Sequence, residues 1–468
     1  MFSRGPANSS SSVGPYSTLS LWHDTLTETI TPRAPLSSNE ASSHYDVVIM
    51  GAGYTGLWTA LALTKMRPDM RVLIVEKEVA GFGASGRNGG WVSALFPTGA
   101  QSLINRHGVA PARALRKAMV DAVASVGKWA SDLDIDCDFV QGGTTVIARN
   151  NIQVHRAHES LDEANILGVD KLEWREASDT LGATHSLGGV FDPACARIHP
   201  AKLVRGLARA LDDTGVRIAE KTEVLHYMPG KVVTNRGSIA CDVVIDAMEG
   251  YRSALKQTRR HSLPLYSLMI ATEPLPDSLF DDIGLNHGMT FSDFRSLVIY
   301  GQRTADNRIA FGGRGAPYHF GSRIKQSYDR VPAVFSALEH TLKEMFPPLA
   351  SASITHTWGG VLGVPRDWHA SVTFDENSGI GRAGGYVGDG VGLSHLAGLT
   401  LADLIAGEPS ARTELPLVGH QSPQWELEPL RYLGATAAIT GVGVADYIES
   451  KTGRPSLVSR LIAPLTGH

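Results

Sequence analysis

Three closely spaced glycines follow a short apolar run and open a segment with helical spacing. Gly51, Gly53 and Gly56 come directly after the apolar residues 45–50. In such a pattern the first glycine permits a tight turn, the second lets the backbone approach a pyrophosphate, and the third lets helix and strand pack closely. The N-terminus of the helix then directs partial positive charge at the phosphates. The pattern therefore predicts a dinucleotide site. We expect its first contacts to be Gly51, Gly53, Tyr54, Thr55 and Gly56.

An acidic residue ends the next apolar run, at residues 71–76. Glu76 stands about 20 residues beyond the glycines, where dinucleotide-binding folds place a ribose-binding carboxylate. Such a carboxylate accepts hydrogen bonds from ribose hydroxyls and repels a 2′-phosphate. We therefore expect an unphosphorylated dinucleotide, with Glu76 and the adjacent Lys77 in contact with it.

A second glycine-rich loop, residues 81–91, follows Glu76. A loop with so little side chain can run close to a large flat cofactor, and a nicotinamide-binding fold does not need one. An ordinary flexible surface loop is the alternative interpretation. The contacts that we expect in this loop are Gly83, Ala84, Ser85, Arg87, Asn88, Gly89, Gly90 and Trp91.

A third glycine-rich stretch, residues 384–393, enters an apolar segment with helical spacing that ends near residue 405. A helix beginning there directs its backbone N–H groups at the pyrimidine edge of a flavin, where reduction places negative charge. This third stretch favours FAD. The residues expected to contact it are Gly388, Asp389, Gly390, Val391, Gly392 and Leu393.

Composition and charge narrow the class of partner. The formal net charge of -4 gives no basic field of the kind that nucleic-acid binding needs. The three cysteines, Cys137, Cys195 and Cys241, lack the spacing of a zinc site or disulfide framework, so no metal is expected. No secretory leader pattern and no apolar stretch of roughly 18 residues is present. We expect a cytoplasmic protein with a small-molecule partner, no nucleic acid and no membrane span.

The glycine-rich blocks also carry a family resemblance. Residues 85–90, 199–207 and 385–390 resemble motifs of the FAD-dependent D-amino-acid oxidase and sarcosine oxidase superfamily, especially gamma-glutamylputrescine oxidase-like enzymes. The resemblance implies that Val224 meets adenine through its backbone, and that Ala247 and Gly250 flank the cofactor. Residues 247–250 read Ala-Met-Glu-Gly, where the family usually has Ala-Thr-x-Gly.

Alternating strands and helices predict an α/β protein. We expect a Rossmann-like FAD-binding domain of the glutathione-reductase type and a discontinuous substrate domain with a mixed sheet. The apolar residues Leu19, Leu21, Trp22 and Leu26 are expected to dock on the body, with a partner-binding motif as the alternative. The expected ranges are 1–43 for a flexible N-terminal extension; 44–100, 193–258 and 353–410 for the FAD-binding domain; 101–192 and 259–352 for the substrate domain; and 411–468 for a C-terminal segment packed on the body.

The resemblance implies oxidation of a primary or secondary amine, such as a simple amine, an N-methylamino acid or an aminophosphonate. A hydride passes to flavin N5 and the imine hydrolyses to an aldehyde or keto product. No general base is needed if the amine arrives neutral, so we assign no catalytic residue.

Two details of the sequence bear on how FAD is attached and reoxidised. No cysteine follows Cys241 and no histidine lies between Glu76 and Gly90, where some relatives attach FAD covalently, so we expect noncovalent FAD. O2 is the expected acceptor, giving H2O2. However, Ala310 stands where sarcosine oxidase-like relatives carry a lysine, so a dehydrogenase with another acceptor stays open, as does a non-amine flavin oxidoreductase.

Arg314 is the leading candidate for substrate binding. It follows two glycines at the end of a predicted strand, and a guanidinium can hold a carboxylate or phosphonate at two points. A surface salt bridge is the alternative role. Tyr266 and Trp358 are further candidate pocket residues, for which core packing is at least an equal alternative. Tyr318 and His319 are candidates that could equally pack against the edge of the domain. His356, Arg366 and His369 rank below them.

Overall fold

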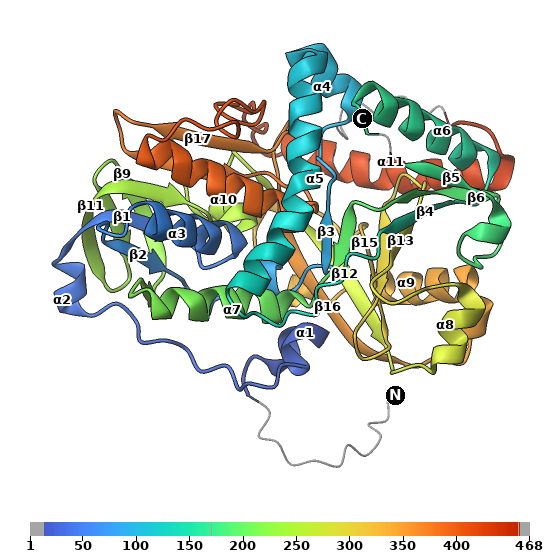
Figure 1. The fold of residues 1–468 in the computed structure, drawn as a ribbon, viewed down its shortest axis with the longest axis horizontal. Coiled ribbons are helices and arrows are strands. Elements are labelled where there is room, and N and C mark those ends of the chain that lie inside the picture. Colours follow the sequence, from blue (N-terminus) through green and yellow to red (C-terminus); the bar gives the residue numbers. More distant parts are fainter. Residues whose placement is uncertain (1–13, 170, 457, 459–468) are drawn as a thin grey trace.

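The computed structural model describes residues 14–169, 171–456 and 458 of the chain. Two large sheets lie side by side, each covered by its own helices (Figure 1). Strands are interspersed with helices along the whole chain, as expected for an α/β protein. Cys137, Cys195 and Cys241 are buried and free.

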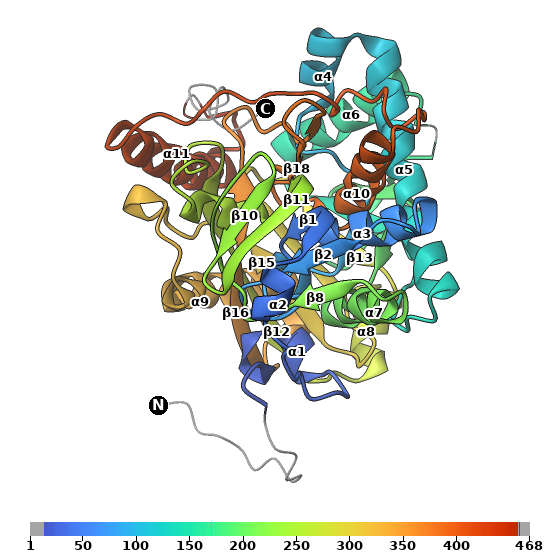
Figure 2. The same ribbon diagram turned by 90° about the vertical axis from the view of Figure 1, so that its left-hand side faces the viewer.

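The first sheet is centred on β1 (His44–Met50), which runs parallel to the strand on each side of it. Met50 pairs with Val75 on one side and with Asp246 on the other, so the carboxyl ends of these three strands share one edge. Figure 2 shows this sheet with a β-hairpin crossing it. Its other strands are β2 (Val72–Val75), β8 (Arg217–Ala219), β11 (Gly237–Asp246), β17 (Ser371–Asp375), β18 (Ile380–Gly384) and the hairpin strands β9 (Val224–Met228) and β10 (Lys231–Thr234).

Helices and the hairpin cover opposite faces of this first sheet. Apolar side chains of four helices form one core with Val47 and Ile49, and the hairpin forms another with Val48 and Met50. This alternation along β1 is what a strand buried on both faces requires. The four helices are α3 (Tyr54–Met66), α5 (Val109–Asp132), α7 (Pro200–Asp213) and α10 (Gly390–Ala406).

The second sheet is mostly antiparallel. One of its faces packs against α8 (Asp277–Ile283) and α9 (Pro332–Met345) in a separate apolar core. α6 (Asn151–Ile166) lies beside β4 and β6. The strand order is β16 (Ile354–Val364), β12 (Leu263–Thr272), β15 (Ile309–Gly313), β14 (Ile299–Arg303), β13 (Thr290–Asp293), β4 (Thr144–Ala148), β6 (Gly188–Asp192) and β5 (Glu173–Arg175). A small separate sheet pairs β3 (Trp91–Ser93) with β7 (Cys195–Arg197).

Two elements, β16 and α5, each pack with the domain other than the one to which the expected ranges assign them. β16 falls within the range 353–410 expected for the FAD-binding domain, but it pairs with β12 along its length in the second sheet. α5 falls within the range 101–192 expected for the substrate domain, but it packs against α10 and shares the core of the first sheet. Apolar periodicity reveals that an element is buried, and it does not say against which neighbour.

The chain before β1 packs against the body over residues 14–43, so the expectation of a flexible extension is wrong for this part. Leu21 and Trp22 are 1% and 2% exposed, and Leu19 is also buried, which confirms the predicted docking of this group. Leu26 is half-buried beside it. Short helices occur at α1 (Leu21–Asp24) and α2 (Ser38–Ala41). Residues 1–13 of the expected extension lie outside the described residues.

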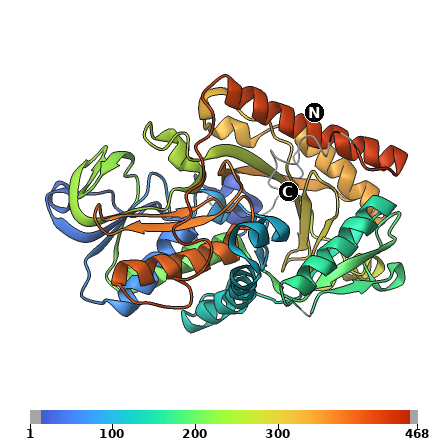
Figure 3. The ribbon, with the colours of Figure 1, turned by 90° about the horizontal axis from the view of Figure 1, so that it is seen from above.

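The C-terminal segment contains one long helix, α11 (Leu430–Thr452). Figure 3 shows it running along the half of the molecule that holds the second sheet. Trp425, just before it, is buried and donates its indole N–H to the Val364 carbonyl at 2.8 Å. This segment thus packs on the body, as expected. Residues 457 and 459–468 lie outside the described part.

Candidate cofactor and substrate site

The first turn of the site joins two neighbouring strand ends. Gly51 follows β1 and Glu76 follows β2. The Glu76 carboxylate accepts backbone N–H bonds from Ala52 and Glu78, both at 2.9 Å. Withdrawal of this carboxylate from bulk water raises its pKa to about 7, although the two N–H groups oppose the shift. An acceptor held at the carboxyl edge of parallel strands is well placed for ribose hydroxyls.

The glycines of this turn occupy positions that no larger residue fits. A Cβ on Gly56 would lie 2.1 Å from the Gly51 carbonyl oxygen. Gly51 itself has a φ of +107°, and a Cβ on it would lie 2.9 Å from the Ala247 carbonyl oxygen. The backbone is therefore bare where a pyrophosphate would approach, which fits the predicted dinucleotide.

The second glycine-rich loop is tied to this turn. Here we call residues 81–91 the flavin loop. The Tyr54 N–H donates to Ser85 Oγ at 2.9 Å, joining the start of α3 to the loop. The Asn88 amide donates to the carbonyls of Ala84 and Ser85 at 3.1 Å and accepts the Gly90 N–H at 2.8 Å. These bonds fix the shape of the loop from within.

Arg87 anchors the same loop to the second sheet. Its guanidinium forms an ion pair with Asp329 at 2.6 Å and donates to the Tyr251 hydroxyl at 3.0 Å. The Arg87 side chain is 2% exposed, so the pair is screened little by solvent. Asp329 was not singled out from the sequence. Asp329 follows Arg87 by 242 residues in the sequence, and no local motif marks it.

The Ala247 carbonyl lies beside the dinucleotide turn, 2.9 Å from where a Cβ on Gly51 would lie. A Cβ on Gly250 would meet the backbone of Leu362 and Gly363, so this segment also touches β16. Val224 begins β9, two residues after Thr222, whose N–H donates to the Glu76 carbonyl at 2.8 Å. Val224 thus lies near the expected adenosine end of the site.

Glu249 is a site residue that sequence reasoning missed. Its carboxylate accepts the N–H groups of Gly385 and Tyr386 at 2.9 and 3.3 Å, and burial raises its pKa. It thereby joins the segment after β11 to the third glycine-rich stretch. The sequence marks Glu249 only through the unusual Ala-Met-Glu-Gly at residues 247–250, which departs from the Ala-Thr-x-Gly of the family.

A cavity of about 1060 Å³ opens between the flavin loop and the second sheet. The third glycine-rich stretch closes another side of it, through residues 387–389 and Val391. Tyr266 and Arg314 both line it, so the structure brings these two predicted residues together. The flavin-loop residues in its wall are Ala84, Arg87, Asn88, Gly89 and Trp91.

Arg314 presents a guanidinium to this cavity without a close carboxylate among the described residues. Its Nη2 donates to the Val387 carbonyl at 2.6 Å, and its guanidinium carbon lies 5.5 Å from the centre of the Trp368 ring. Burial lowers the pKa of Arg314, although the charge of Asp389 opposes the shift. Burial likewise raises the pKa of Asp389 to about 6, against the effect of Arg314. A half-buried cation with spare donors is suited to binding an anionic group.

Trp368 is a second residue that the sequence did not reveal. It lines the cavity, and it lies between Arg366 and His369, which the sequence analysis named with a low rank. His369 is fully buried and stacks near His420 at 3.9 Å, away from the cavity lining. An isolated tryptophan in a loop gives no periodic signal, so only the three-dimensional position identifies it.

Three predicted pocket residues lie outside the described cavity lining. The Tyr318 hydroxyl donates to Glu428 at 2.7 Å, and His319 stacks on Tyr328 with ring centres 3.3 Å apart. Trp358 lies beneath the flavin loop and donates its indole N–H to the Arg87 carbonyl at 2.9 Å. Ala310 is buried in the same apolar cluster as Trp358.

Comparison with known proteins identifies the family. A family model described as FAD dependent oxidoreductase (DAO) matches residues 46–404. Gamma-glutamylputrescine oxidoreductase of Escherichia coli is 30% identical over 385 residues, covering 80% of this chain and 87% of the relative. A probable oxidoreductase, OrdL, of Haemophilus influenzae is 29% identical over 387 residues, covering 78% of this chain and 84% of the relative.

Solved structures share the fold. Glycine oxidase from Geobacillus kaustophilus superposes with a TM-score of 0.68 at 20% identity, covering 81% of this chain and all of that one. L-proline dehydrogenase from P. horikoshii gives a TM-score of 0.66 at 18% identity, covering 83% of this chain and 96% of that one. Within the described residues, none of the helices combines the length and apolar character that crossing a membrane requires.

Proposed function

Because this chain belongs to the DAO family of FAD-dependent oxidoreductases, we propose that it oxidises a primary or secondary amine carrying a carboxylate or phosphonate. The observation that carries the proposal is the Arg314 guanidinium, which faces the cavity beside the third glycine-rich stretch. The similarity to a gamma-glutamylputrescine oxidoreductase supports an amine as the substrate. N-methylamino acids and aminophosphonates fit the same description.

FAD is proposed to bind without a covalent link. Glu76 would hold the ribose, the bare backbone at Gly51 and Gly53 the pyrophosphate, and the flavin loop with residues 388–393 the ring. Once bound, FAD supplies an acceptor for the hydride of the amine. Acid precipitation of the yellow protein is expected to release the colour into the supernatant. Yellow colour retained in the pellet would contradict noncovalent attachment.

The chain itself positions the substrate and excludes water. Arg314 would bind the anionic group, and Tyr266 and Trp368, which also line the cavity, offer aromatic surface to the rest of the substrate. The charge of Asp389 raises the pKa of Arg314 against the effect of burial, which keeps the guanidinium charged for an incoming carboxylate or phosphonate. This arrangement orients the carbon beside the amine without a dedicated base.

We propose O2 as the acceptor, with H2O2 as its product. A dehydrogenase with another acceptor is the second candidate, and one observation favours it. Ala310, at the position where sarcosine oxidase-like relatives carry a lysine, is fully buried among apolar side chains. No ammonium group is therefore supplied to a cofactor from that position.

Anaerobic mixing with a panel of amines tests the proposal. N-methylamino acids and aminophosphonates are expected to bleach the flavin absorbance near roughly 450 nm, and plain alkylamines to bleach it more slowly. Re-aeration with release of peroxide would then support the oxidase, and slow recovery without peroxide the dehydrogenase. A yellow protein that no amine bleaches would overturn the amine proposal.

A further inference from the structure

The chain segment before β1 wraps the cofactor side of the first sheet. We call residues 14–41 the N-terminal arm; it runs from α1, beside α7 and β16, to α2, beside β11 (Figures 1 and 2). The family model begins at residue 46, so the match to the family assigns no role to the arm. The arm contacts the body along its length, and two of its contacts reach the flavin loop and the turn that leads into that loop.

The first contact is with the flavin loop. Trp22 is 2% exposed, and its indole N–H donates to the Asn88 carbonyl at 2.8 Å. Trp358, on β16, donates in the same way to the carbonyl of the preceding residue, Arg87. The two indoles meet edge to face with ring centres 6.1 Å apart. Two successive carbonyls of the loop are thus held from outside, one of them by the arm.

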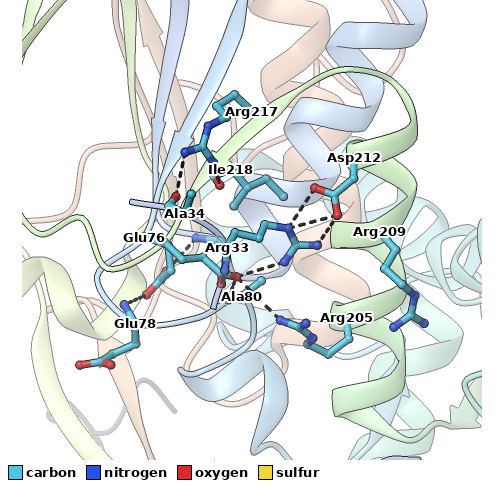
Figure 4. A network of polar contacts seen from close by, with 12 residues as sticks. Arg33, Ala34, Glu76, Glu78, Ala80, Arg205, Arg209, Asp212, Arg217 and Ile218 are labelled. Atoms are coloured by element: carbon cyan, nitrogen blue, oxygen red, sulfur yellow. Dashed lines mark hydrogen bonds and ion pairs between the residues drawn. The ribbon is translucent and has the colours of Figure 1, made fainter. Parts of the chain in front are cut away.

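The second contact is with the turn between Glu76 and the flavin loop (Figure 4). The Arg33 backbone N–H donates to Glu220 at 2.6 Å, and its guanidinium pairs with Glu220 at 3.1 Å and with Asp212. Glu220 is fully buried and also accepts the Ala80 N–H at 2.8 Å. One buried carboxylate therefore connects the arm to the turn that leads from Glu76 into the loop.

We propose that the N-terminal arm is a clamp that holds the FAD-facing turns in their binding shape, with Trp22 and Arg33 as its positioning residues. This inference rests on the proposed FAD site. A loop already held in the bound shape loses less conformational freedom when the cofactor binds. By linkage, docking of the arm and binding of FAD strengthen each other equally.

A matched pair of tryptophan variants tests the clamp. Trp22→Phe keeps an aromatic ring but removes the N–H that reaches Asn88. Trp58→Phe also removes a buried indole N–H, one without a hydrogen-bond partner among the described residues. Apoprotein is titrated with FAD, and quenching of FAD fluorescence gives Kd. We expect Trp22→Phe to raise Kd roughly 5- to 10-fold, as loss of one hydrogen bond allows, and Trp58→Phe to stay within about twofold.

Hydrogen exchange on the unaltered protein gives a readout that does not depend on a variant folding. FAD should slow amide exchange at residues 23–25, whose N–H groups bond within the arm, and leave the amides of α6 unchanged. Equal Kd values for Trp22→Phe and wild type, or exchange in the arm that ignores FAD, would overturn the clamp. An unaltered apoprotein that takes up no FAD would instead overturn the proposed function itself.

Discussion

The cofactor end and the substrate end of the site are built in different ways. At the cofactor end, bare backbone and one carboxylate meet at the edge of three parallel strands, within 26 residues of sequence from Gly51 to Glu76. At the substrate end, the wall is made of single side chains from distant elements, among them Tyr266, Arg314 and Trp368. The first end is shaped by local backbone geometry and the second by long-range packing. Mutations at the cofactor end should therefore change Kd for FAD, and mutations at the substrate end should change kcat/KM.

Replacing Arg314 should give the largest effect, and it should fall on the substrate end. Arg314→Gln removes the cation from an ion pair that the bound substrate would bury, at a cost of about 2 to 5 kcal/mol, or roughly 30-fold to several thousand-fold in kcat/KM. Steady-state kinetics on an anionic amine and on a plain alkylamine measure this. The plain amine serves as the control and should lose far less. Equal losses on both would show that Arg314 acts on the flavin or on folding.

Replacing Gly56 should break the cofactor end. In Gly56→Ala the added Cβ would lie 2.1 Å from the Gly51 carbonyl oxygen, so the turn must open. Overpacking of this kind costs about 1 to 3 kcal/mol, which corresponds roughly to a 10- to 100-fold higher Kd for FAD. Gly443→Ala, with no neighbour within 4 Å of the new Cβ, is the matched control. Retention of full FAD occupancy by Gly56→Ala would argue against this turn as the pyrophosphate site.

The pH dependence of FAD binding should come from Glu76. The pKa of this group is about 7 in the apoprotein against an ordinary 4.5. Ribose hydroxyls donating to its carboxylate favour the ionised form, so Kd for FAD should fall as pH rises from 6 to 8, by roughly up to 10-fold. For folding the sign is opposite: the raised pKa contributes stability to the apoprotein below pH 4.5, which is lost as pH rises through 7. Glu76→Gln should remove both dependences, as titrations and melts across this range would reveal.

The smallest effect on turnover is expected at Tyr318. Its hydroxyl bonds to Glu428 and accepts the Ser322 N–H at 3.0 Å, outside the cavity. Tyr318→Phe should therefore lower the free energy of unfolding by about 1 kcal/mol and leave kcat/KM within about twofold. Thermal melts and kinetics together separate the two. A large loss of kcat/KM at unchanged stability would indicate that Tyr318 contacts the substrate after all.

The same contrast explains what could be predicted from the sequence. Gly51, Gly56 and Glu76 can be identified from the sequence, because a tight turn, close packing of a helix on a strand, and a ribose acceptor each require one residue type at a fixed spacing. β1, β2 and α10 followed from apolar runs and helical spacing for similar reasons. These features are local, so a linear pattern contains them.

The rest depended on contacts that no linear pattern contains. Asp329 lies in the short 3-10 helix Gln326–Asp329 and Trp368 in a loop, and only folding brings them to Arg87 and Arg314. The sequence boundaries also place β16 in the first sheet instead of the second, because the apolar pattern of a buried strand is the same in either sheet. Tyr318 and His319 follow Arg314 closely in sequence, yet the chain turns away after residue 316 and carries them from the cavity.

The strand order of the first sheet also constrains when the protein can acquire its cofactor during synthesis. β1 leaves the ribosome early, but its neighbour β11 ends at Asp246, and the sheet is not complete until β18 at Ile380–Gly384 has been made. The helix that follows, α10, ends at Ala406. Nascent chains released before about that point would lack a finished nucleotide pocket, whatever their N-terminal motif. On this topology the proposed FAD site is completed only late in synthesis, and the apolar β1 lacks its neighbour β11 until Asp246 has been made.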